Sequence, residues 1–110
     1  MASLNKAMVI GAVHSAPVIK YTSTGEPVTT VTIITTEKHK SKNGDMEDHP
    51  ELHYVRLSGK LAEIAVEFLG VGKSIYVEGA MKSRSWSDNA GSHERTEIVC
   101  EKLQLLGGRA

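Results

Sequence analysis

Alternation of apolar and polar positions dominates the first third of the chain. A mainly apolar run predicts a strand over residues 6–13, and a longer strand is predicted over residues 28–37, where β-branched side chains with little helix preference predominate. Residues 16–21 between them have an extended pattern, and residues 23–27 have the composition of a turn. Gly11 lies inside the first strand, where a glycine indicates a bulge or a sharp bend.

The apolar signal is absent from Lys38 to Pro50. Residues 38–45 form a polar hairpin, with the Asn43-Gly44 pair at its tip, because this dipeptide favours a tight turn. Residues 52–57 resume the alternation and predict a further strand.

One helix is predicted after that strand. Ser58 is its expected N-cap, and Gly70 and Gly72 are expected to end it. Its apolar residues recur three and four positions apart and form one buried stripe, which consists of Leu61, Ile64, Ala65, Phe68 and Leu69.

The chain then returns to strands over residues 74–86 and 96–105, joined by a turn at 87–91. Three strands, one helix and two strands is the order of an all-β, five-stranded Greek-key barrel of the OB fold, with one short helix between strands 3 and 4. Closure of the sheet removes exposed strand edges. Because 110 residues suit one core, residues 1–110 are expected to form a single domain.

Composition narrows the classes of function. Thirteen basic and thirteen acidic residues give a formal net charge of zero, whereas nucleic-acid-binding domains usually carry a basic excess. No stretch approaches the roughly 20 apolar residues of a membrane helix and no secretory leader is visible, so no membrane partner is expected. The single cysteine, Cys100, fits a cytoplasmic protein, and we expect its side chain to be buried as a small apolar group.

The residues lack the spacing of a catalytic or metal site. Five histidines and many serines show no nucleophile-and-base motif, and no phosphate-binding glycine loop is present. Residues 45–49 offer oxygen and nitrogen ligands without the rhythm of a calcium loop, so we interpret them as a solvated acidic loop. We therefore expect neither an enzyme nor a metal or other cofactor.

Basic residues alternate at two places in the chain. Lys82 and Arg84 share one face of a predicted strand with Trp86, and this combination is typical of single-strand binders, which need cations for phosphates and a ring for a base. In the alternative, Trp86 covers a barrel end and the basic residues only keep a hairpin soluble. Alternation also predicts one shared face for Lys38, Lys40 and Lys42. The acidic residues Asp45, Glu47, Asp48 and Glu51 lie beyond the tip, so a local basic groove is compatible with a net charge of zero.

Several segments, in order along nearly the whole chain, resemble bacterial single-stranded DNA-binding proteins. The matching segments are residues 4–11, 20–28, 59–64, 75–79, 84–88, 96–99 and 105–109. The resemblance implies an OB fold that binds single-stranded DNA without reading its sequence, in replication, recombination and repair, in the cytoplasm with the nucleoid. It also implies a homo-oligomer, usually a tetramer.

This chain keeps only one of the aromatic residues that stack on bases in the family it resembles. Trp86 keeps its aromatic, whereas the other such positions fall on His39, Leu52 and Ser58. Because a stacking ring contributes roughly 1–3 kcal/mol per base, we expect weaker and more salt-sensitive binding than in typical relatives. The expected DNA-binding residues are Lys6, Lys38, His39, Lys40, Lys42, Tyr54, Arg56, Lys60, Lys82, Arg84 and Trp86.

Self-association is expected through the first strand, as a dimer or a tetramer. The expected interface residues are Leu4, Met8, Ile10, His53 and Tyr76. The apolar excess that suggests an interface also includes Ile75, Val77 and Leu103, more alternating apolar positions than one small barrel needs.

A second interpretation also fits the sequence. Family members normally continue beyond the Leu-Gly-Gly-Arg region into a linker and an acidic tip, whereas this sequence stops at Ala110. The alternative is a tail-less accessory OB protein, similar to a primosomal protein or to plasmid and phage proteins, with weak DNA binding. Such a protein acts mainly through replication or primosome partners.

Overall fold

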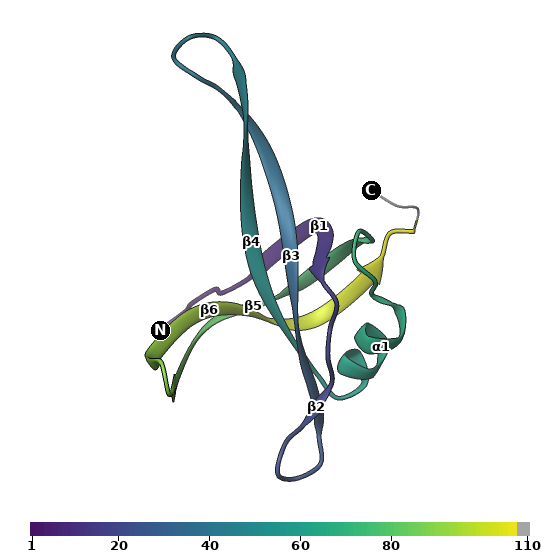
Figure 1. Ribbon diagram of the computed structural model, residues 1–110. Coiled ribbons are helices and arrows are strands. Elements are labelled where there is room, and N and C mark those ends of the chain that lie inside the picture. The colour runs from purple at the N-terminus through teal and green to yellow at the C-terminus, as the bar shows by residue number, and fades with distance from the viewer. Residues whose placement is uncertain (108–110) are drawn as a thin grey trace.

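The computed structural model describes residues 1–107. Figure 1 shows a barrel from which two strands extend as a long arm. In chain order, the elements are β1 (Ala7–Ser15), β2 (Lys20–Tyr21), β3 (Pro27–Lys40), β4 (Met46–Ser58), α1 (Lys60–Phe68), β5 (Ser74–Asp88) and β6 (Gly91–Leu105).

The strands form the predicted closed barrel. Neighbours follow the order β1-β5-β6-β4-β3, and the antiparallel pairing of β1 with β3 closes the ring. β4 and β6 run parallel at Val55 and Arg56, as the Greek-key connection requires, while all other neighbours are antiparallel. The prediction of an all-β, five-stranded OB barrel is confirmed, and the two-residue β2 is a further short strand beside β3.

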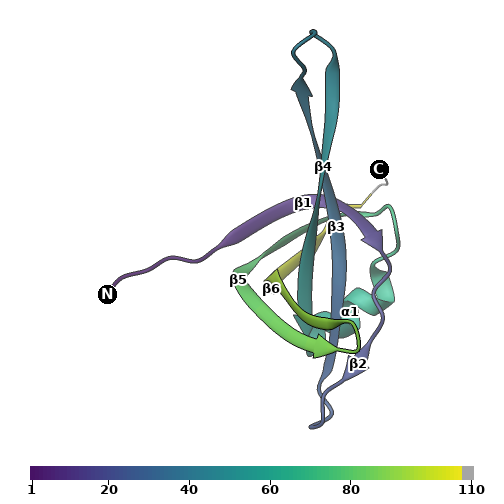
Figure 2. The ribbon, with the colours of Figure 1, turned by 60° about the vertical axis from the view of Figure 1, so that its left-hand side comes forward.

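The two long hairpins extend further than the sequence pattern predicts. β3 and β4 are paired without interruption from Val28–Ser58 to Lys40–Met46, so the polar hairpin is mostly strand and projects from the barrel (Figures 1 and 2). Asn43-Gly44 lies at its tip as predicted, where Gly44 has a φ of 92°. β6 begins at Gly91 rather than at residue 96.

Helix α1 packs against β3 and β4, but its ends and its buried side differ from the prediction. Ser58 still belongs to β4, and Gly59 is the N-cap, with a φ of 62° and no side-chain cap. Ala62 is buried, whereas Phe68 is 47% exposed. α1 has nine residues, and the described chain has no helix of the length and apolarity that crossing a membrane requires.

The core lies inside the barrel and beneath α1. Cys100 is buried, so the prediction for this cysteine is confirmed. Its burial raises the pKa of the thiol. The core residues are Val13, Val31, Ile33, Val55, Leu57, Ala62, Ala65, Leu69, Ile75, Val77, Ile98 and Cys100.

Two glycines permit close approach of neighbouring strands. A Cβ at Gly11 would lie 2.6 Å from Ile33 Cγ2, where β1 crosses β3, so this glycine serves packing. A Cβ at Gly79 would lie 2.0 Å from the carbonyl oxygen of Val99. Gly79 also marks a register shift between β5 and β6, which leaves Glu101 without an opposite residue.

Candidate nucleic-acid interface

Cationic side chains and aromatic rings line one side of the β5–β6 hairpin. The register sets Arg84 opposite Arg95 and Trp86 opposite His93, and Lys82 opposite Glu97. Because side chains alternate along a strand, all six belong to one side of the hairpin. The predicted shared face of Lys82, Arg84 and Trp86 is therefore present, and β6 adds three further polar groups to it.

Glu97 anchors this set of side chains. Its side chain is only 1% exposed, and each carboxylate oxygen accepts hydrogen bonds from a different arginine. Arg84 Nε donates to Oε1 at 3.1 Å, and Arg95 donates to Oε2 through Nη2 at 2.7 Å and through Nε at 3.2 Å. A buried carboxylate is tolerable here because two guanidinium groups compensate its charge.

The guanidinium groups in turn contact aromatic rings. Arg95 lies over Tyr54 of β4, 4.2 Å from the ring centroid, and is 5.3 Å from the centroid of Trp86. Arg84 lies 4.6 Å from the Trp86 ring. His93 stacks on Trp86 with centroids 5.2 Å apart and ring planes inclined by 24°. These contacts hold the charged groups and the rings in one packed layer.

A hollow continues this layer across the barrel. Its lining includes Lys20, Arg56 and Arg84, together with Val28 and Thr30. Among the described residues, Lys20, Arg56 and Lys82 take part in no ion pair. We call this surface the basic face and define it by Lys20, Tyr54, Arg56, Lys82, Arg84, Trp86, His93, Arg95 and Glu97. Five cationic side chains thus stand against the buried carboxylate of Glu97, and the exposed Asp88, which pairs with His93 at 2.9 Å, adds a second carboxylate at the end of this face.

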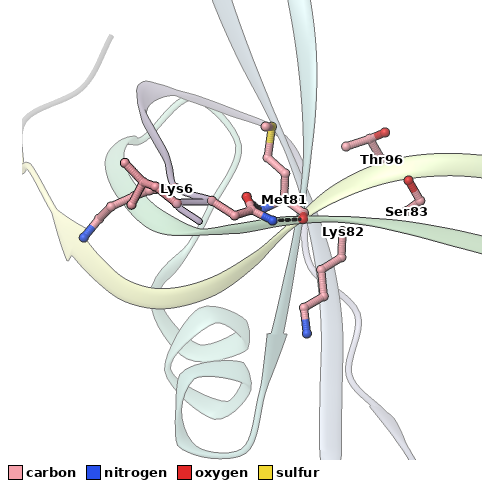
Figure 3. Close-up of a pocket in the computed structure, with 7 residues that line it drawn as sticks. Lys6, Met81, Lys82, Ser83 and Thr96 are labelled. Carbon is pink, nitrogen blue, oxygen red and sulfur yellow. Dashed lines mark hydrogen bonds between the residues drawn. The ribbon is translucent and has the colours of Figure 1, made fainter. Parts of the chain in front are cut away.

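Lys6 lies apart from Lys82. In the pocket of Figure 3, the Asn5 amide bridges the backbone of Met81, and Lys82 extends away from both Lys6 and Ser83. Lys6 pairs with Glu78 at 2.8 Å, and this contact raises the pKa of the Lys6 ammonium and lowers the pKa of the Glu78 carboxyl. The positive charge of Lys6 is therefore partly compensated.

The predicted lysine face on the β3–β4 arm is smaller than expected. Lys38 and Lys40 share one side of β3, whereas Lys42 lies in the turn. The acidic residues do not all stay beyond the tip, because the register sets Asp48 opposite Lys38, with which it pairs at 2.7 Å, and sets Glu47 opposite His39. From residue 37 to residue 51 the arm holds three lysines against five carboxylates, so it is net acidic with its histidines neutral.

The other side of the arm carries paired histidines and glutamates. His39 packs edge-on against His49, with ring centroids 4.6 Å apart, and each histidine lies near a glutamate of its own strand. The arm projects away from the β5–β6 hairpin in both views, so the two hairpins present different parts of the surface (Figures 1 and 2).

The remaining predicted DNA-binding residues and family aromatic positions are dispersed. Leu52 is half exposed and lines an apolar pocket with Met8 and His53. Ser58 ends β4, and Lys60 is exposed at the start of α1. Of the predicted DNA-binding residues, the fold brings together Tyr54, Arg56, Lys82, Arg84 and Trp86.

The expected interface residues fall on and near the outer side of β1. Met8 is 65% exposed and Ile10 is 63% exposed, while Leu4 precedes β1 and is 89% exposed. The side chain of Tyr76 hydrogen-bonds Glu78, and His53 bonds Thr35 Oγ1 at 2.8 Å. Ile75 and Val77 belong to the core and Leu103 packs against it, so they add nothing to the exposed apolar excess.

The sequence prediction does not include four residues of the basic face, which are Lys20 in the hollow and three residues of β6. His93, Arg95 and Glu97 alternate along β6, directly opposite the predicted face on β5. The signal was the uninterrupted run of polar residues from 93 to 97, which becomes informative once β6 is extended back to Gly91.

The comparisons with known proteins agree with this architecture. Residues 4–106 match the model of the Single-strand binding protein family. Single-stranded DNA-binding protein 1 of Xylella fastidiosa (strain 9a5c) is 46% identical over 109 residues, covering 97% of this chain and 80% of the relative. The protein of the same name from Chlorobaculum tepidum is 37% identical over 108 residues, covering 96% and 67%.

Solved structures show the same fold. The Plasmodium falciparum SSB complex with ssDNA superimposes with a TM-score of 0.83 and 26% identity, covering 97% of this chain and 98% of that one. A deletion mutant of the single-stranded DNA binding protein from Thermus aquaticus gives a TM-score of 0.81 and 27% identity, covering 96% and 52%. The family model and the close relatives together establish that this chain belongs to the Single-strand binding protein family.

Proposed function

We propose that this protein binds single-stranded DNA without reading its sequence, through the basic face, in support of replication, recombination and repair. The observation that carries the proposal is the layer in which two arginines pair with one buried carboxylate and contact two aromatic rings, with three further cations on the same face. The proposal is also supported by relatives named for single-stranded DNA binding and by a structural neighbour whose description includes ssDNA.

The basic face offers both interactions that such binding needs. Guanidinium and ammonium groups attract phosphates, and arginine forms charge-assisted hydrogen bonds with phosphate oxygens. Trp86 offers a flat ring on which any base can stack, because every base has a π-face. Since neither interaction depends on the edge of a base, the binding tolerates any sequence.

The other predicted contacts are placed outside this primary surface. Lys38, His39, Lys40 and Lys42 lie on or at the tip of a net acidic arm, where phosphate attraction is weakened by nearby carboxylates. Lys6 is ion-paired, and Lys60 lies at the start of α1. We propose that these residues make peripheral contacts and that the affinity depends strongly on salt, because few stacking rings supplement the phosphate attraction.

The assembly and cellular setting follow from the same proposal. Residues 1–110 act as one domain that self-associates, as a dimer or a tetramer, through β1 with Leu4, Met8 and Ile10, and with His53 and Tyr76 at the same interface. The exposure of Met8 and Ile10 supports this arrangement. A protein of this kind binds rather than catalyses, and it works on DNA in the cytoplasm.

A second candidate function is an accessory role through protein partners. The observation that favours it is the projecting β3–β4 arm, whose excess of carboxylates repels phosphates and leaves its surface open to replication or primosome proteins. This candidate predicts weak DNA binding beside a stable protein complex.

The fluorescence of Trp86 tests the primary proposal, because it is the only tryptophan in the chain. Titration with oligo-dT at low salt should quench the signal to a stoichiometric end point, and raising the salt should weaken the affinity steeply. Sedimentation of the same samples gives the mass of the binding species. Unchanged fluorescence at low salt, together with no change in mass, would contradict the proposal.

A further inference from the structure

The position of Glu97 is unexpected for a surface that binds a polyanion. A carboxylate beneath cationic side chains lowers the local positive potential, so electrostatics alone predicts that its presence weakens DNA binding. A buried carboxylate is also expensive to desolvate, and Glu97 is as buried as the core residues. Unless Glu97 has another effect, its charge weakens DNA binding and its burial costs free energy of folding.

The hydrogen bonds of Glu97 identify that effect. Each of its oxygens holds a separate arginine, so the two guanidinium groups are fixed relative to one another by one rigid group. Arg95 is thereby held over Tyr54, and Arg84 is held against Trp86. Arg84 uses only its Nε in this contact, and its two terminal nitrogens donate no hydrogen bond to any described residue. They are left available for phosphate oxygens.

We propose that Glu97 is a positioning residue of the DNA site, which fixes Arg84 and Arg95 against Trp86 and Tyr54 before DNA arrives. This inference rests on the proposed function. An arginine that is already ordered loses little conformational freedom on binding, so the affinity gained by preorganisation exceeds the affinity lost to the negative charge.

The sign of one substitution separates this role from a simple counter-charge. Glu97→Gln removes a negative charge, so a merely electrostatic role predicts tighter binding and a steeper salt dependence. A positioning role predicts weaker binding, by about tenfold, which is the cost of one well-placed hydrogen bond to a charged group. Glu97→Asp keeps the charge but shortens the side chain, and it should also weaken binding.

Glu94 provides the matched control. It is exposed on β6 three residues earlier, and alternation sets it on the other side of the hairpin. Glu94→Gln and Glu94→Asp make the same chemical changes and should leave the affinity unchanged or, for the glutamine, slightly tighter. The affinities are measured by Trp86 fluorescence with oligo-dT at two salt concentrations, after circular dichroism has confirmed that each variant is folded.

Arg95→Lys is the second test, needed where Glu97→Gln fails to fold. It keeps the net charge and an ion pair with Glu97 but loses the planar group over Tyr54, and it should weaken binding several-fold. If the unmodified protein does not bind oligo-dT, the proposed function fails. If it binds, and the folded variants at Glu97 and Arg95 bind as tightly or more tightly, the positioning role is overturned while the DNA-binding function stands.

Discussion

The β3–β4 and β5–β6 hairpins are both long antiparallel ribbons, yet they carry charge in opposite ways. On the β3–β4 arm, the register sets Asp48 opposite Lys38, and the ion pair that they form is solvent-exposed. On the β5–β6 hairpin, the register aligns two arginines over one buried carboxylate. A chain of zero net charge therefore holds one basic surface and one acidic arm. The pairing of strands, rather than the count of charges, decides where a polyanion can bind.

The two hairpins also differ in what their ion pairs contribute. An exposed pair is worth about 0–1 kcal/mol, because water and salt screen it. The removal of one partner from a buried pair costs about 3–5 kcal/mol, because the remaining charge is left without compensation.

Arg95→Ala should lower the free energy of unfolding by about 3 kcal/mol, because Glu97 loses the partner that donates two of its hydrogen bonds. Lys38→Ala on the arm is the matched change and should cost less than about 1 kcal/mol. Urea denaturation of both variants measures the difference. Equal losses would mean that the two ion pairs are energetically alike.

Trp86→Ala should weaken binding of oligo-dT by about 10- to 100-fold, because one stacked base contributes roughly 1–3 kcal/mol. His39→Ala, which removes the ring that occupies a family aromatic position on the arm, should change the affinity less than about threefold. Anisotropy of labelled oligo-dT measures both variants without the tryptophan signal. A larger loss for His39→Ala would transfer the primary DNA site to the arm.

Neutralising the arm should improve DNA binding modestly. The double variant Glu47→Gln, Asp48→Asn removes two of the carboxylates that face the lysines and histidines, and binding should tighten by about threefold at low salt and not at high salt. Glu63→Gln with Glu67→Gln on α1 changes the net charge equally and serves as control. If both double variants gain equally, only the total charge matters and the arm has no particular role.

The smallest effect concerns the pH dependence of the exposed pair at Lys6. The pKa of Glu78 is lowered by Lys6 and by the Tyr76 hydroxyl, so its stabilisation is present above the ordinary value of 4.5 and is lost as pH falls through the lowered pKa. The pKa of Lys6 is raised, so its contribution is present below 10.5 and is lost as pH rises through the raised pKa. Between these limits, this pair should add no pH dependence to thermal unfolding.

Lys6→Gln tests that assignment. The variant should lose the alkaline component and part of the acid component, with a small change at neutral pH because the pair is exposed. A difference between the two proteins that varies across the neutral range would contradict it.

Much of the fold could be predicted because local patterns specify it. The β-branched alternation of β3 and the Asn43-Gly44 tip both lie where the sequence places them. The predicted ends of the strands were less accurate, because strand pairing extends β3 and β4 into a polar segment whose own residues have little strand preference. Phe68 was assigned to the buried stripe of α1, but the barrel is covered by the smaller Ala62 and Ala65.

From the residues alone, the candidate site was predictable only along a single strand, and the resemblance to a family added Tyr54 and Arg56 of β4. Lys82, Arg84 and Trp86 share a face through alternation alone, which the sequence shows directly. The contact of Arg95 with Tyr54 joins β6 to β4, and no local pattern reveals a neighbour that barrel closure creates. The position of Asp48 opposite Lys38 was missed for the same reason, because it depends on the register between β3 and β4.

The alternation of His93, Arg95 and Glu97 along β6 limits where this hairpin can gain or lose residues. Because side chains alternate, the loss or gain of one residue between His93 and Glu97 would turn Arg95 or Glu97 to the opposite side of the ribbon. Length changes there should be accepted only two residues at a time, whereas the turn at residues 41–45 lies outside the barrel and should admit added loops of any length. A genetically inserted tag or fluorophore therefore belongs at the tip of the β3–β4 arm.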